Sequence, residues 1–131
     1  MTRLTAAGVQ TRVFAGSPAE VRNVRTFVGR VIRGCPLADD VVLLASELAA
    51  NAIVHTASGA GGSFFVSVCA EDRRVRIEVH DLGSAGTPAV RQSTVPGESG
   101  AGLSLVETIA TRWGHHGGAD GRVVWFEVDW Q

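Results

Sequence analysis

The stretch S-E-L-A-A-N-A-I-V-H-T, residues 46–56, spaces Glu47, Asn51 and His55 four residues apart among apolar neighbours. At 3.6 residues per turn, this spacing places the three side chains along one face of a helix. The face is either solvated, which is the commoner case, or it meets a ligand. Between residues 41 and 57 there is no lysine or arginine and Glu47 is the only formal charge, whereas solvated helix faces usually carry mixed charges. The pattern therefore indicates a ligand without identifying it.

The composition fits one ordinary globular domain. The chain has 131 residues, of which 45% are hydrophobic, and a formal net charge of -1; we expect a single domain over residues 1–131. No apolar run reaches membrane-spanning length, and the opening MTRLTAAGVQTR lacks the apolar core of a signal peptide. This predicts a protein without membrane contact. Cys35 and Cys69 form no C-x-x-C pair, so we expect a protein of the reducing cytoplasm.

The basic residues and histidines narrow the possible functions. All twelve basic residues are arginine, and a chain without lysine cannot build a Walker A loop, which needs a lysine on the phosphates. The near-neutral charge argues against direct nucleic-acid binding, which normally requires a strong basic excess. His115 and His116 are adjacent and His80 lies in a strand pattern, so the histidines do not predict a metalloenzyme.

Periodicity predicts clustered strands and helices. S-P-A-E starts the first helix, with Ser17 as N-cap, Pro18 at the first helical position and Glu20 closing a capping box. Further helices are expected at about 37–55 and 103–113, strands at 10–15, 63–70 and 74–81, and a last hairpin that turns at G-G-A-D-G (117–121). This order predicts an α+β fold, a two-layer sandwich in which about three helices cover one face of a mostly antiparallel mixed sheet.

One long connection interrupts this pattern. Residues 82–99, LGSAGTPAVRQSTVPGES, contain glycine, proline and serine without periodicity. Arg91 is the only basic residue between Arg76 and Arg112. A connection of this length inside a compact domain is more often a functional lid than a passive linker, so we expect a lid over about residues 84–99.

Asp81 ends a strand beside a glycine turn, H-D-L-G-S-A-G. A carboxylate in this position is often only part of an Asx turn. Alternatively, a carboxylate that only accepts hydrogen bonds can receive the exocyclic amino group of adenine, and it would repel the oxygen that guanine carries there. Gly83 and Gly86 would then let the backbone approach a flat ring closely.

The segment S-G-A-G-L-S-L-V, residues 99–106, places Gly100 and Gly102 where the third helix begins. These glycines form either a flexible joint or a phosphate cradle, in which free backbone N–H groups and the positive end of the helix dipole face an anion. Such a cradle needs no lysine. With phosphates present, the Asn51 side-chain oxygen can ligate Mg²⁺, and Glu47 can orient or deprotonate an attacking hydroxyl as general base.

Three segments, E-L-A-A-N-A-I-V-H-T, D-L-G-S-A-G and S-G-A-G-L-S-L-V, follow one another in this order. Together they resemble the three ATP-binding boxes of the superfamily that contains gyrase, the heat-shock chaperone ATPase, histidine kinases and MutL. T-R-W-G (111–114) and V-W-F-E (124–127) also match the small stand-alone anti-sigma factor serine/threonine kinases within it. The resemblance covers nearly the whole chain, from the first helix to the end of V-W-F-E.

The resemblance implies a Bergerat-type sandwich that binds ATP and Mg²⁺ under a lid. It implies a regulator that holds a sigma factor inactive and phosphorylates a serine or threonine of a STAS-type antagonist domain, and a homodimer would be unsurprising. By the same resemblance, Glu47 is the catalytic base, Asn51 the magnesium ligand and Asp81 the adenine contact. The remaining nucleotide-binding residues that it implies are His55, Gly83, Gly86, and the phosphate loop of Gly100, Ala101, Gly102 and Leu103.

Two departures from the family pattern leave a second interpretation open. The first glycine box reads D-L-G-S-A-G rather than the tighter D-x-G-x-G, and Val123 stands where the final strand often has a threonine that helps to hold adenine. The alternative is an interaction module that binds nucleotide weakly or not at all and only sequesters a partner. The ATPase half of a histidine kinase fits poorly, because no helical dimerisation segment precedes the domain.

Overall fold

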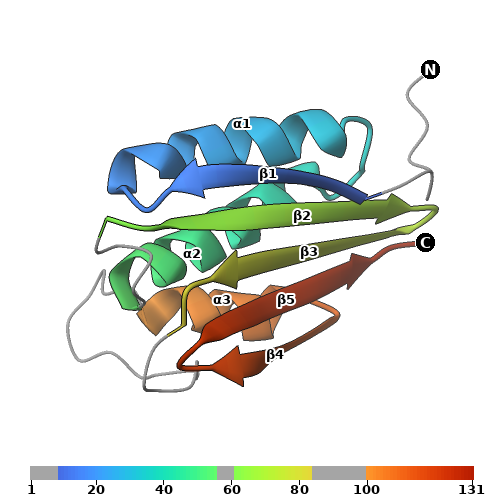
Figure 1. Cartoon of the computed structure of the whole chain (residues 1–131). Coiled ribbons are helices and arrows are strands. Elements are labelled where there is room, and N and C mark those ends of the chain that lie inside the picture. The colour runs from blue at the N-terminus through green and yellow to red at the C-terminus, as the bar shows by residue number, and fades with distance from the viewer. Residues whose placement is uncertain (1–8, 56–60, 84–99) are drawn as a thin grey trace.

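The computed structural model describes residues 9–55, 61–83 and 100–131, with only the backbone given for residues 100–103. These residues form the predicted α+β sandwich, with five strands in one layer and the helices in the other (Figure 1). In chain order the elements are β1 (Val9–Ala15), a 3-10 turn (Pro18–Glu20), α1 (Val21–Val31), α2 (Ala38–His55), β2 (Ser63–Glu71), β3 (Arg74–Asp81), α3 (Gly100–Ile109), β4 (Arg112–Gly118) and β5 (Gly121–Asp129).

The sheet has the strand order β1-β2-β3-β5-β4, and every pairing between its described strands is antiparallel. After β3 the chain forms α3, enters the edge strand β4 and returns as β5 between β4 and β3. The end of β3 therefore lies beside the start of β5, although α3 and β4 separate the two strands in sequence.

The core lies between the sheet and the helices. Side chains alternate along each strand with a period of two, so that Ile77 and Val79 of β3 and Val124 and Phe126 of β5 are buried on the helical side. Phe14 joins the edge strand β1 to this core. The same alternation leaves the intervening residues on the uncovered face of the sheet.

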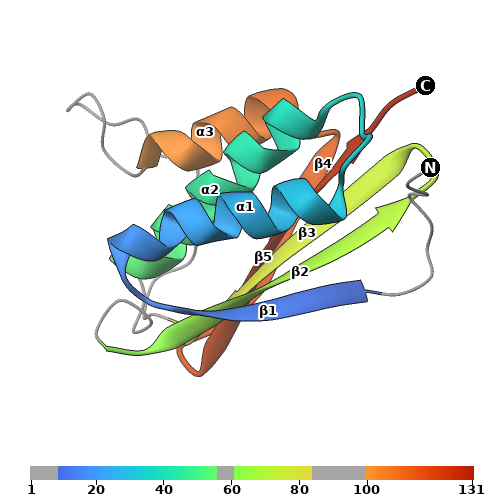
Figure 2. The same ribbon diagram turned by 90° about the horizontal axis from the view of Figure 1, so that it is seen from above.

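The apolar character of α2 follows from its position between α1 and α3, over the sheet (Figure 2). Leu44, Leu48, Ala45 and Ala49 are all buried. A helix with neighbours on several sides must be apolar around most of its circumference. The polar residues of the opening stretch are thus exceptions on a core helix.

The start of α1 differs from the predicted capping box. Ser17 holds the N-cap position of the 3-10 turn, but its side chain makes no capping hydrogen bond. The Glu20 carboxylate instead accepts hydrogen bonds from the Ala15 backbone N–H, at 3.3 Å, and from the Asn23 side-chain amide. Glu20 therefore connects the end of β1 to α1.

The third helix also differs from its predicted range. It begins at Gly100 and ends at Ile109 instead of covering residues 103–113. Trp113 belongs to β4, pairs with Phe126 of β5 and packs against the core. Local periodicity did not predict this, because the strand partner of Trp113 is remote in sequence.

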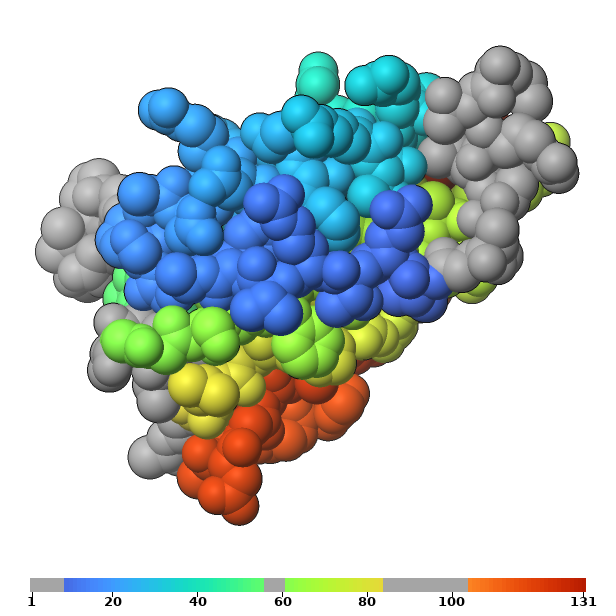
Figure 3. Space-filling model, turned by 45° about the horizontal axis from the view of Figure 1, so that its top comes forward, coloured from blue at the N-terminus to red at the C-terminus, as the bar shows by residue number. Residues whose placement is uncertain are grey.

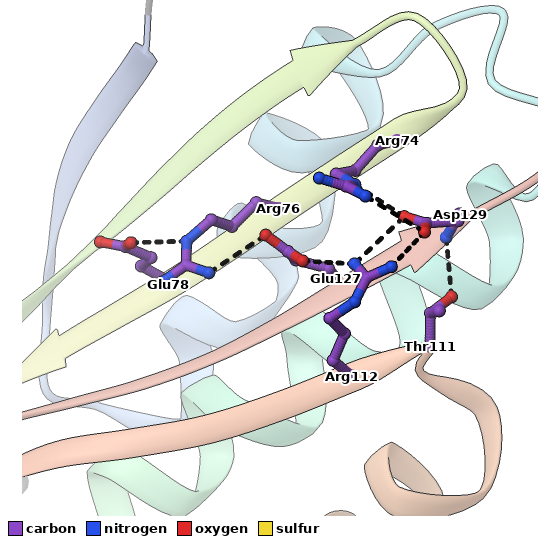
Figure 4. A network of polar contacts seen from close by, with 7 residues as sticks. All are labelled: Arg74, Arg76, Glu78, Thr111, Arg112, Glu127 and Asp129. Atoms are coloured by element: carbon purple, nitrogen blue, oxygen red, sulfur yellow. Dashed lines mark hydrogen bonds and ion pairs between the residues drawn. The ribbon is translucent and has the colours of Figure 1, made fainter.

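The uncovered face of the sheet carries a network of ion pairs and hydrogen bonds (Figure 4). Its members are Arg74, Arg76, Glu78, Thr111, Arg112, Glu127 and Asp129. Arg74 Nε lies 2.9 Å from Asp129 Oδ1, and Arg112 contacts both Asp129 and Glu127. These pairs connect three neighbouring strands, β3, β5 and β4.

At the opposite edge, β1 lies beside α1 on the molecular surface (Figure 3). Beneath that surface Phe14 stacks on Phe64 of β2, with ring centroids 5.7 Å apart, and meets Phe27 of α1 edge-on at 6.0 Å. Aromatic contacts of this kind join the two layers.

No helix in the described part of the chain has the length and apolar character that a membrane crossing requires.

Candidate functional site

The three polar residues of α2 lie in its C-terminal half and differ in burial. Asn51 is 5% exposed, whereas Glu47 and His55 are half-buried. His55 is the last residue of the helix. A buried amide one turn from a more accessible carboxylate is a polar pair on a largely apolar helix, and such pairs on core elements call for a functional explanation.

Asp81 ends β3 on the buried face of the sheet. Its Oδ1 accepts a hydrogen bond from the Gly83 backbone N–H at 2.7 Å, so the Asx-type turn considered from the sequence is present. Gly83 has a φ of +83°, and a Cβ there would lie 2.1 Å from the Gly118 carbonyl oxygen. Only glycine fits this position, because the end of β3 packs directly against the β4–β5 turn.

A residue that the sequence analysis did not select faces Asp81. Arg122 pairs with Asp81 in the register of β3 and β5. The Arg122 Nε donates to Asp81 Oδ2 at 3.2 Å, and Nη2 lies 3.2 Å from the same oxygen. Both side chains are almost fully buried, at 2% and 1% exposed. The expected adenine contact is therefore half of a buried ion pair.

The signal for Arg122 was present in the sequence. In G-R-V-V-W-F-E-V it alternates in phase with Val124, Phe126 and Val128, so a period of two already places an arginine on the buried face. Val123, which the family pattern put at the base-facing position, instead pairs with His80 on the uncovered face. That expectation for Val123 is wrong, because adjacent strand residues point to opposite faces.

The pair has electrostatic consequences. Burial raises the pKa of the Asp81 carboxyl, while the Gly83 N–H and the Arg122 guanidinium act in the opposite direction. A buried carboxylate or guanidinium is tolerated when it is paired and costs several kcal/mol when its partner is removed. Asp81 and Arg122 therefore depend on each other, or on a ligand that takes the place of one of them.

The elements that carry the predicted residues end at the same side of the molecule. The C-terminal end of α2 and the start of α3 in the helical layer, and the end of β3 and the start of β5 in the sheet, all lie at this one end of the sandwich in both ribbon views (Figures 1 and 2). Residues 100–103, the predicted phosphate loop, form the first turn of α3. Gly86 and the predicted lid, residues 84–99, lie outside the described residues.

The chemistry of these residues fits a nucleotide that brings its own metal ion. No group of three or more histidine, cysteine, aspartate or glutamate side chains suited to a metal occurs in the described ranges. Mg²⁺ commonly needs only one or two protein oxygens when phosphates and water complete its octahedral shell. Asn51 offers an amide oxygen of the required kind, and the N-terminal turn of α3 offers backbone N–H groups.

The fold and this set of residues define an ATPase-type domain. A model of the histidine kinase-like ATPase domain matches residues 14–128, so the chain belongs to that family. Among solved structures it is similar to the RsbU and RsbW domains of Rv1364c from Mycobacterium tuberculosis, with a TM-score of 0.70 and 19% identity. That match covers 94% of this chain but 32% of the other, so this chain spans about a third of its length. Among curated proteins, none matches significantly.

Proposed function

We propose that this domain binds ATP with Mg²⁺ and transfers the γ-phosphoryl group to a serine or threonine of an antagonist domain, as an anti-sigma regulator. The observation that carries the proposal is the gathering of α2, β3 and α3 ends at one side of a histidine kinase-like ATPase fold. The similarity to a structure that contains an RsbW domain supports it, as do the motifs shared with anti-sigma factor kinases.

Each predicted residue has a distinct role in this proposal. Asn51 would hold Mg²⁺, which would neutralise phosphate charge, and the turn of residues 100–103 would hold the phosphates through backbone N–H groups. Asp81 would accept a hydrogen bond from the base, and Gly83, Gly86 and His55 would complete the nucleotide contacts. Glu47, more accessible than Asn51, would accept the proton of the attacking hydroxyl.

The partners in this proposal are a sigma factor, which the domain would hold inactive, and the antagonist domain that it would phosphorylate. One surface suits an acidic partner: Arg22, Arg25 and Arg30 lie on α1, where no acidic residue occurs between Val21 and Val31. The ordinary alternative is a solvated basic face, and charge reversal at Arg22 and Arg25 distinguishes the two.

A second candidate function rests on the Asp81–Arg122 pair. If this pair keeps the base site closed, the domain binds no nucleotide and acts only by sequestering a partner. The two functions separate in a direct experiment. Wild-type protein is incubated with γ-labelled ATP, Mg²⁺ and a panel of antagonist domains; phosphoserine or phosphothreonine on one of them supports the kinase. Partner binding without ATP binding or label transfer supports the module.

A further inference from the structure

The Asp81–Arg122 pair leaves one buried donor without a hydrogen bond. Arg122 Nε donates to the carboxylate, but Nη2, although 3.2 Å from Asp81 Oδ2, makes no hydrogen bond with any part of the described chain. Buried polar groups are nearly always hydrogen-bonded, and an unsatisfied one requires an explanation. The charge of Nη2 is matched by Asp81, but its hydrogen bond is not made, and a ligand bound beside the carboxylate would supply that acceptor.

The backbone fixes the pair in place. Asp81 and Arg122 are register partners on adjacent central strands, and the Gly83 N–H holds the other carboxylate oxygen at 2.7 Å. A carboxylate has about four acceptor positions, so the contacts with Gly83 and Arg122 leave capacity for a ligand. The pair therefore holds a donor and an acceptor side by side.

Purine edges match this arrangement in a way that a lone carboxylate does not. Adenine presents an amino donor at position 6 beside the N1 acceptor, and guanine presents an oxygen at position 6 beside the N1–H donor. A lone carboxylate accepts from the adenine amino group and repels the guanine oxygen. An arginine beside it can donate to that oxygen, an atom that arginine also contacts, together with N7, when it reads guanine in DNA.

We propose that Arg122 is a specificity-determining residue of the base site, which supplies a donor beside Asp81 and admits purines with either an amino group or an oxygen at position 6. The inference rests on the proposed nucleotide binding and changes the expected selectivity. Asp81 alone predicts ATP and not GTP, whereas the pair predicts that both bind.

Titration calorimetry of the full chain with ATP, GTP, ITP and purine riboside triphosphate, each with Mg²⁺, tests the proposal. We expect GTP and ITP within about tenfold of ATP, and purine riboside triphosphate, which has neither an amino group nor an oxygen at position 6, at least tenfold weaker than any of them. A preference for ATP over GTP beyond tenfold overturns the role of Arg122 and leaves ATP binding intact. Purine riboside triphosphate as tight as ATP overturns the reading of position 6, and the absence of binding by any nucleotide overturns both proposals.

The variant Arg122→Met removes the donor to the oxygen of guanine. The ratio of ATP to GTP affinity should then rise by roughly 10- to 150-fold, which is the change in affinity that the loss of one hydrogen bond to a charged group causes. An unchanged ratio overturns the proposal. Arg112→Met is the matched control, because Arg112 is 40% exposed in the network of the uncovered face, and it should leave the ratio unchanged. Because Arg122→Met strands a buried carboxylate and can fail to fold, the wild-type ratio decides the matter without it.

Discussion

Glu47 and Asn51 lie one turn apart on the same side of α2, yet Asn51 is buried and Glu47 is half-exposed. Residues four apart on a helix are neighbours, so their side chains can act on one bound group. The buried amide is suited to a fixed ligand contact and the more accessible carboxylate to a reacting hydroxyl. This difference separates the effects that we expect from substituting each residue.

Asn51→Ala should abolish the magnesium-dependent part of ATP affinity. The reason is that a metal ligand acts in the bound ground state, so its loss appears in binding as well as in turnover. Calorimetry with ATP in the presence of Mg²⁺ or of EDTA measures it. Asn23→Ala, which changes the only other asparagine, on α1, is the control and should bind like wild type; a similar loss in both variants would argue against a metal ligand at Asn51.

Gly83→Ala should destabilise the fold by roughly 2–4 kcal/mol, because the new Cβ would meet the Gly118 carbonyl and the backbone φ of +83° is unfavourable for alanine. A drop in Tm of about 5 °C or more is expected in thermal unfolding. Gly118→Ala, in the β4–β5 turn that Gly83 faces, is the matched control, since a Cβ there meets no atom within 4 Å. Equal Tm values for the two variants would contradict the close approach of β3 to the β4–β5 turn.

The network on the uncovered face should contribute stability that disappears in acid. Hydrogen bonds from Arg112 and Arg74 lower the pKa of Asp129 from 3.8 to about 2. Because the folded pKa lies below the unfolded one, the contribution is complete above about pH 4 and is lost as the pH falls towards 2. Urea unfolding from pH 7 to pH 2 should therefore show a gap between wild type and Asp129→Asn that closes in this range.

Asp72→Asn removes the same charge in the exposed β2–β3 turn and is the control for that experiment. It should track wild type at every pH. A gap for Asp129→Asn that stays constant down to pH 2 would show that the ion pairs with Arg112 and Arg74 contribute nothing measurable, as is common for exposed pairs.

The sequence predicted those features that depend on local periodicity. The predicted limits of three elements agree with the structure within a residue or two: the strands at 63–71 and 74–81 and the helix at 38–55. The predicted limits of α3 are wrong, because Trp113 is held in β4 by its pairing with Phe126. Pairing between remote strands cannot be read from local pattern.

The same limit explains why only some residues of the candidate site could be predicted from the sequence. Asp81 and the stretch from Glu47 to His55 were found because each carries a local motif. The Asp81–Arg122 contact depends on the register between β3 and β5, which only the folded sheet specifies. Arg122 was detectable as an arginine on a buried strand face, but its partner was not.

The most direct test of phosphoryl transfer is the single-turnover rate of Glu47→Ala with γ-labelled ATP, Mg²⁺ and the antagonist domain that wild type phosphorylates best. Glu107→Ala, which removes an exposed glutamate from α3, is the matched control, and unchanged melting of both variants shows an intact fold. If Glu47 is the general base, its variant should transfer phosphate about 10²–10⁴-fold more slowly while ATP affinity stays near that of wild type. Transfer by Glu47→Ala at the wild-type rate would contradict the role of Glu47 as general base. If wild type transfers no phosphate to any antagonist domain and Glu47→Ala binds its partner as wild type does, the proposed kinase activity is contradicted.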